Sequence, residues 1–144
     1  MITVELAKEE DFKRIAEIEK ECFHNPWSEE ELLLSYFSDC IFITAKNEGE
    51  IGAYCGAQIS DGAYITNVAT AKDFRGKGFA KAVLSELIRV CQNRGLPFVT
   101  LEVRVGNIAA ISLYESLGFE NLGRRPNFYT CPREDAYIYT LTLQ

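Results

Sequence analysis

Residues 67–80 read NVATAKDFRGKGFA, and this stretch decides the fold. A strand pattern that ends at Thr70 runs into a basic loop with two glycines, and the loop opens directly into a helix near Gly78. Apolar side chains then recur at Phe79, Val83 and Leu87, which is the spacing of an amphipathic helix. The stretch therefore predicts a strand–loop–helix unit with positive charge at its turn.

The loop has the chemical features of a diphosphate-binding site. A helix N-terminus offers backbone N–H groups without partners and a partial positive charge. Gly76 and Gly78 let the backbone approach a ligand closely, and Arg75 and Lys77 supply full charges. The loop lacks the Lys-Ser/Thr pair of a nucleoside-triphosphate loop and the G-x-G-x-x-G of a dinucleotide site. For the loop taken alone, the alternative is a surface turn with incidental lysines.

A second informative stretch, residues 101–119, reads LEVRVGNIAAISLYESLGF. Glu102 lies near the end of a predicted strand, between two apolar residues whose side chains point to the opposite face. Asn107 suits the N-cap of the helix that follows, and Tyr114, seven residues later, lies on the same face of that helix. Taken separately, Glu102 also fits a solvated strand edge, and Tyr114 also fits a core position.

Hydrophobic periodicity along the whole chain predicts a mixed α/β domain of the α+β type, with about seven strands and four helices. The predicted strands are residues 2–7, 40–46, 51–59, 63–70, 98–103, 119–128 and 135–143. The predicted helices are residues 9–23, 28–37, 78–93 and 107–117. A helical crossover makes strands 63–70 and 98–103 parallel and central in an otherwise mostly antiparallel sheet.

Two local patterns refine the first two helices. The stripe that the first helix turns inward is mostly apolar and consists of Phe12, Ile15, Ala16, Glu19, Cys22 and Phe23. The second helix starts with a capping box, in which the Ser28 hydroxyl and the Glu31 carboxylate bind each other's backbone N–H groups.

Composition limits the classes of function. The 144 residues fit a single domain that spans 1–144, and no apolar run approaches the ~20 residues of a membrane helix. The net charge of −6 argues against direct nucleic-acid binding. His24 is the only histidine and the five cysteines have no C-x-x-C spacing, so no metal site is expected. Reduced thiols of this kind predict a cytoplasmic protein.

The two stretches together resemble the signatures of the GCN5-related N-acetyltransferase (GNAT) family. Residues 75–80 are similar to that family's R/Q-x-x-G-x-G/A loop, and residues 107–119 are similar to its second signature. The predicted order of strands and helices also looks like the family's, so the resemblance covers essentially the whole chain. It implies a GNAT fold and an enzyme that transfers an acetyl group from acetyl-CoA to an amine within a ternary complex.

The resemblance also implies roles for individual residues. Glu102 matches the family's general base, acting directly or through a water, and Tyr114 matches the general acid that protonates the departing thiolate. Asn107 would contact the pantetheine arm. The thioester carbonyl would meet backbone N–H groups of Val68, Ala69 and Thr70. The diphosphate would lie on the loop and the first helical turn, namely Arg75, Gly76, Lys77, Gly78, Phe79, Ala80 and Lys81.

Finer features concern the acceptor. The segments at 23–28, 101–104 and 125–129, the last followed by residues 134–136, are similar to a bacterial branch of the family that acetylates the N-terminal alanine of a ribosomal protein. This resemblance implies ribosomal protein bS18 as the partner. A monomer or weak dimer is expected for the protein itself. Within the same reaction class, another protein N-terminus, a lysine or a small amine stays open as the acceptor. The alternative from a different class is a non-catalytic acyl-CoA sensor.

Overall fold

The computed structural model describes residues 1–143, so that only Gln144 of the predicted domain lies outside the described residues. Within them the strands are β1 (Ile2–Leu6), β2 (Cys40–Asn47), β3 (Glu50–Ile59), β4 (Ala63–Thr70), β5 (Phe98–Arg104), β6 (Glu120–Thr130) and β7 (Arg133–Thr142). The α-helices are α1 (Phe12–Cys22), α2 (Glu29–Tyr36), α3 (Phe79–Asn93) and α4 (Ile108–Ser116). Two 3₁₀ turns, η1 (Glu9–Asp11) and η2 (Lys72–Phe74), precede α1 and α3.

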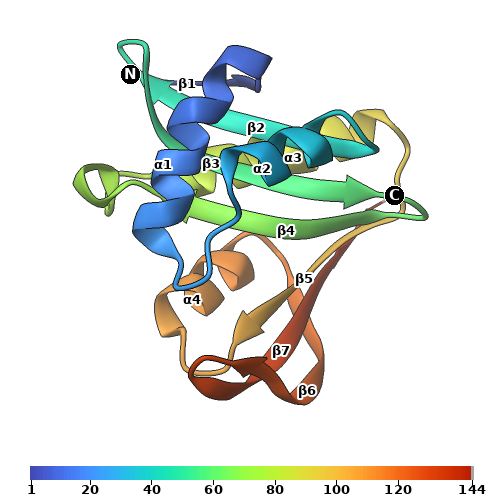
Figure 1. Ribbon diagram of the computed structural model, residues 1–144. Coiled ribbons are helices and arrows are strands. Elements are labelled where there is room, and N and C mark those ends of the chain that lie inside the picture. Colours follow the sequence, from blue (N-terminus) through green and yellow to red (C-terminus); the bar gives the residue numbers. More distant parts are fainter. Residues whose placement is uncertain (144) are drawn as a thin grey trace.

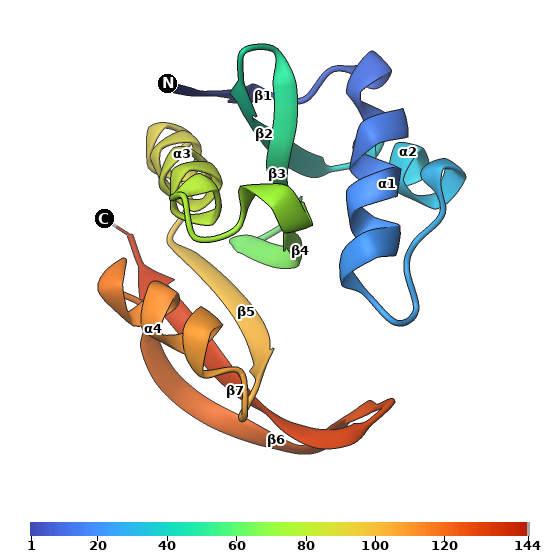
Figure 2. The same cartoon turned by 90° about the vertical axis from the view of Figure 1, so that its left-hand side faces the viewer.

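The strands form one sheet in the order β1-β2-β3-β4-β5-β7-β6. Only β4 and β5 pair in parallel, and the other neighbours in this sheet are antiparallel. Helices α1 and α2 lie on one side of the sheet and α3 and α4 on the other (Figures 1 and 2). The predicted fold class, a mixed and mostly antiparallel sheet with a central parallel pair and four helices, is confirmed.

Each side of the sheet has its own apolar core. Beneath α1 and α2, the side chains of Phe12, Ile15 and Ile18 are fully buried. On the opposite side, Val83 and Leu87 of α3 are fully buried. Burial of each such side chain contributes about 1.5–3 kcal/mol. The helical spacing seen in the sequence therefore fixes which face of α1 and of α3 meets the sheet.

The central parallel pair is short, and this shapes the site. β4 and β5 are registered only at Ala63–Val99 and Tyr64–Thr100, at the beginning of both strands. Farther along the two strands diverge, as the separation between the β1–β4 and β5–β7 parts of the sheet shows (Figure 2). Backbone N–H and C=O groups along the separated edges lack the ladder partners of a closed sheet. The carboxyl halves of β4 and β5 therefore present backbone groups to a ligand.

A β-bulge at Thr66 reverses the side of the sheet to which the following side chains of β4 point. The register with β3 shifts by one residue there, so that Thr66 is the extra residue of β4. Ala63, before the bulge, packs in the core beneath α3, whereas Ala69, after it, packs in the core beneath α1. In an unbroken strand these two residues would share a face. The bulge thereby turns Asn67 toward α1.

The helix bounds follow the sequence patterns closely. The predicted helix at 9–23 begins as η1 and continues as α1, and the Asp11 carboxylate accepts from the Lys8 N–H at 2.8 Å. At α2, the Ser28 hydroxyl accepts from the Glu31 N–H at 3.1 Å, and the Glu31 carboxylate accepts from the Ser28 N–H at 2.9 Å. The predicted capping box is therefore confirmed. No helix in residues 1–143 is long and apolar enough to cross a bilayer.

Ser28→Ala is expected to lower the free energy of unfolding by about 1 kcal/mol, because the Glu31 N–H loses its acceptor at the start of α2. Urea denaturation followed by circular dichroism measures this change. Ser35→Ala, in the same helix, is the matched control and should be neutral or slightly stabilising, because alanine has the higher helix propensity. Equal losses in the two variants would contradict a capping role.

Candidate active site

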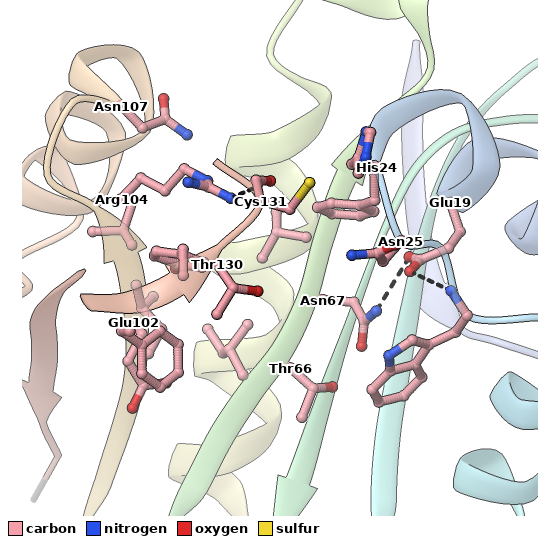
Figure 3. A pocket seen from close by; sticks show the side chains of 18 of the residues that line it. Glu19, His24, Asn25, Thr66, Asn67, Glu102, Arg104, Asn107, Thr130 and Cys131 are labelled. Carbon is pink, nitrogen blue, oxygen red and sulfur yellow. Dashed lines mark hydrogen bonds between the residues drawn. The ribbon is translucent and has the colours of Figure 1, made fainter. Parts of the chain in front are cut away.

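A cavity of about 460 Å³ lies between the two diverging parts of the sheet. Its walls come from four segments, within residues 19–27, 65–68, 101–114 and 128–131. In Figure 3, Glu102, Arg104 and Asn107 lie on one side, and Glu19, His24 and Asn25 lie on the other. Thr66 and Asn67 of β4 stand between them. The bulged part of β4 therefore forms the floor between two walls of side chains.

Glu102 reaches the cavity from β5. Its neighbours Leu101 and Val103 are buried at 3% and 5% exposure, whereas the Glu102 side chain is 32% exposed. The predicted alternation along this strand is confirmed. The Glu102 carboxylate pairs with the guanidinium of Arg125 from β6, with Nε and Oε2 3.2 Å apart. The carboxylate thus carries its ion pair at the cavity wall.

Tyr114 reaches the same cavity from α4 and is 7% exposed. Burial, with smaller contributions from Tyr129 and Cys55, raises the pKa of Tyr114 to about 12. The hydroxyl is therefore a proton donor throughout the neutral and mildly alkaline range. Asn107 starts the same helix, where its Oδ1 accepts from the Ala110 N–H at 3.2 Å, as the sequence predicted. Glu102, Tyr114 and Asn107, which the sequence singled out separately, thus line one cavity.

The wall beside Glu102 is tied together by Arg104. Its guanidinium pairs with the Glu134 carboxylate at 3.1 Å and donates to the carbonyl oxygens of Pro132 and Cys131 at 2.9 and 3.1 Å. It also lies 4.2 Å from the centre of the Tyr129 ring, a cation–π contact. Arg104 therefore fastens the β6–β7 hairpin to the end of β5.

The same hairpin contains a wide bulge. Between the pairs Arg125–Ala136 and Tyr129–Glu134, three residues of β6 oppose only Asp135 of β7. The Asp135 carboxylate accepts from the Asn127 N–H and from the Arg124 guanidinium, both at 2.8 Å. These two bonds lower the pKa of Asp135, so that it stays charged at neutral pH. The bulge places Phe128 and Tyr129 at the cavity.

The opposite wall centres on Glu19, which is 2% exposed. Its carboxylate accepts from the Tyr54 hydroxyl, from Asn67 Nδ2 at 3.1 Å and from the Trp27 N–H at 3.0 Å. Burial is the main cause that raises the pKa of Tyr54, and the Glu19 charge adds to it. Sequence reasoning assigned no role to Glu19. The available signal was a carboxylate within the apolar stripe of α1.

The predicted cofactor loop lies at the start of α3, next to the end of β4. Gly76 and Gly78 have φ values of 74° and 88°, a left-handed conformation that favours glycine. The first hydrogen bond of α3 runs from the Ala82 N–H to the Gly78 carbonyl at 3.1 Å. The N–H groups of residues 79–81 therefore have no acceptor within the helix. This is the arrangement expected for an anion-binding loop.

The predicted cofactor residues do not all lie together. Val68 and Asn107 line the cavity, whereas Ala69, Thr70 and residues 75–81 lie outside its lining. Lys77 and Lys81 are exposed, and Phe79 is buried in the core. The Arg75 guanidinium turns back, and it donates to the Thr70 carbonyl at 3.2 Å and to the Cys22 thiol at 3.4 Å. Within residues 1–143 no three His, Cys, Asp or Glu side chains are grouped to hold a metal ion.

Comparisons with known proteins agree with this geometry. Residues 12–119 match the model of the acetyltransferase (GNAT) family. The [ribosomal protein bS18]-alanine N-acetyltransferase of Haemophilus ducreyi is 35% identical, over 97% of this chain and 99% of that protein. The enzyme of the same name from Escherichia coli K12 is 34% identical, over 99% of both chains.

Solved structures show the same fold. The crystal structure of the ribosomal-protein-S18-alanine N-acetyltransferase from Escherichia coli superposes with a TM-score of 0.92 at 33% identity, covering 100% of this chain and 95% of that one. Arabidopsis thaliana NAA60 in complex with acetyl-CoA shares the fold, with a TM-score of 0.89 at 20% identity over 99% of this chain and 100% of that one. Together with the family match over most of its length, these likenesses establish that the chain belongs to the GNAT acetyltransferase family.

Proposed function

We propose that the protein acetylates the α-amine of the N-terminal alanine of ribosomal protein bS18, with acetyl-CoA as the acetyl donor. The observation that carries this proposal is that Glu102 and Tyr114 line one cavity beside the open edges of β4 and β5. The acceptor is supported by the names of the relatives that are 34–35% identical over nearly the whole chain.

The donor side fits the diphosphate and thioester of acetyl-CoA. Unpaired N–H groups at the start of α3, two left-handed glycines and the exposed Lys77 and Lys81 offer a site for a diphosphate. The open edge of β4 at residues 68–70 offers backbone N–H groups for the thioester carbonyl. Arg75, bonded to the Thr70 carbonyl, holds the loop on the end of β4.

The acceptor side fits an α-amine. A free peptide α-amine has a pKa of about 7.7–8.0, so a carboxylate is a sufficient base near neutral pH. In the proposed reaction the amine nitrogen attacks the thioester carbon, and the C–S bond then breaks. Glu102, directly or through a water, takes the proton that the nitrogen loses, and Tyr114 gives its proton to the departing sulfur.

The direct test is to incubate the protein with acetyl-CoA and a peptide that carries the N-terminal sequence of bS18, and to follow the product by mass spectrometry. We expect one acetyl group on the α-amine of alanine. Glu102→Gln should lower kcat by about 10²-fold or more, because the amide cannot accept the proton. Glu86→Gln is the matched control, since it breaks the exposed Glu86–Arg89 ion pair on α3 without changing the cavity.

The assay also separates the alternatives. Acetylation of a lysine side chain or of a small amine, with none on the peptide α-amine, would show that the acceptor is that amine and not a protein N-terminus. Binding of acetyl-CoA without transfer to any amine would leave an acyl-CoA sensor. Equal turnover of the wild type and Glu102→Gln would rule out the role of Glu102.

Tyr114 gives a prediction about pH. Because burial raises its pKa to about 12, kcat/KM for the peptide should rise as the substrate amine loses its proton and should not fall up to about pH 10. Tyr114→Phe should lower kcat by about 10²-fold at every pH in this range. Tyr139→Phe, a buried tyrosine that binds Glu115 away from the cavity, is the control. The role of Tyr114 as a proton donor would be contradicted if wild-type activity fell between pH 8 and 10 and the activity of Tyr114→Phe did not fall in that range.

The cofactor loop is tested by a matched pair of glycines. Gly78 and Gly49 have φ values of 88° and 83°, and a methyl group on either would meet open space, so alanine costs each position roughly 1–2 kcal/mol of strain. Only Gly78→Ala changes the N-terminus of α3. In calorimetric titrations with coenzyme A we expect Kd to rise about tenfold for Gly78→Ala and to stay unchanged for Gly49→Ala. Equal affinities of the two variants for coenzyme A would indicate that the diphosphate does not bind at the N-terminus of α3.

A further inference from the structure

Glu19 is a buried carboxylate that has no cationic partner among the described residues. Its three donors are neutral groups from three different elements: the Tyr54 hydroxyl of β3, the Asn67 amide of β4 and the Trp27 N–H that follows α1. Replacing buried charged groups by apolar side chains of similar volume is often neutral or stabilising. Stability alone therefore does not account for the cluster.

The loop between α1 and α2 is bonded to Glu19, and its Trp27 side chain also packs against the core beneath α1. It contributes Phe23, His24, Asn25 and Trp27 to the cavity wall. Within residues 1–143, the bond from the Trp27 N–H to Glu19 is the one hydrogen bond that ties residues 24–27 to the rest of the fold. Through the same carboxylate this loop is joined to β3 and β4.

Asn67 gives a second observation. It is 5% exposed, lines the cavity, and donates its Nδ2 to Glu19 while its Oδ1 has no partner among the described residues. The bulge at Thr66 is what turns this side chain toward α1. β-Bulges and buried polar atoms without a hydrogen-bond partner are found more often near functional sites than elsewhere in folded proteins.

We propose that Glu19 is a positioning residue for the acceptor. Glu19 fixes the α1–α2 loop and Asn67 against β3, and it thereby sets the cavity wall that faces Glu102. This inference deepens the proposed function and rests on it. Glu19 acts on the acceptor through the loop and does not touch the reacting atoms. Loss of the cluster therefore raises the KM for the peptide and leaves the KM for acetyl-CoA unchanged.

The test combines steady-state kinetics on the alanine peptide with fluorescence. Glu19→Gln keeps the size of the side chain but leaves a single acceptor oxygen where three donors now converge. We expect the KM for the peptide to rise about tenfold, which corresponds to about 1.4 kcal/mol. Trp27, the only tryptophan of the chain, lines the cavity and reports on the loop, so its emission should shift to longer wavelength.

Two further variants keep the proposal falsifiable if Glu19→Gln does not fold. Tyr54→Phe removes one donor from a residue that does not line the cavity, so any rise in peptide KM has to pass through the Glu19 cluster, of which Asn67 is also a member. Thr44→Val is the matched control. Thr44 is buried directly opposite Tyr54 in β2, its hydroxyl has no partner among the described residues, and it lies outside the cavity lining. Thr44→Val should therefore keep the wild-type peptide KM and the wild-type emission.

The outcomes separate this proposal from the function on which it rests. If the wild type acetylates the peptide and both Glu19→Gln and Tyr54→Phe keep its peptide KM, Glu19 is not a positioning residue. A parallel rise in the KM for acetyl-CoA would overturn it as well, because it would indicate general distortion. If the wild type acetylates no peptide, the proposed function fails instead. The fluorescence comparison then still decides whether Glu19 holds the loop, since unchanged Trp27 emission in both variants would refute it.

Discussion

The short pairing of β4 with β5 is the constraint on which the rest of the structure depends. Two registered residue pairs join the two parts of the sheet, and beyond them the strands separate. A closed parallel ladder would have used the backbone groups of both carboxyl halves, whereas the open one leaves them beside the cavity. Everything else assembles around this opening: α3 starts next to it, β5 brings Glu102, α4 brings Tyr114, and the bulge of β4 directs Asn67. The opening between β4 and β5, together with the bulges of β4 and β6, thus converts a packed α/β layer into a site.

Much of the fold is predictable because it follows from local chemistry. The period of apolar side chains marks α1 and α3, and the Ser28–Glu31 pattern marks the start of α2. The length of α3 is sufficient for a crossover between parallel strands. Glu102 and Tyr114 were also accessible, because strand alternation and helical spacing fix the direction of a side chain. Their roles come from the family resemblance, and the structure adds only that they share a cavity.

The remaining features depend on contacts between segments that are distant in sequence. Nothing in the order of residues in β4 marks Thr66 as the extra one, since the register is set by its pairing with β3. The sequence predicts Arg75 as a phosphate ligand, and its bonds to the Thr70 carbonyl and the Cys22 thiol are contacts that the sequence does not reveal. Glu19 was recognisable only as a carboxylate in an apolar stripe, because its donors belong to β3, β4 and a loop.

The distribution of these groups has a consequence for how such an enzyme changes its preference. In the proposed mechanism the acetyl donor is held largely by main-chain N–H groups at the carboxyl end of β4 and at the N-terminus of α3. These N–H groups are present whatever the side chains are. In the same proposal the acceptor would meet side chains of the α1–α2 loop and of the bulged β6–β7 hairpin, which line the cavity. Substitutions in these two surface segments can redirect the enzyme to a different amine while the donor half stays as it is. The scaffold thereby keeps one cofactor and leaves its choice of substrate open to evolution.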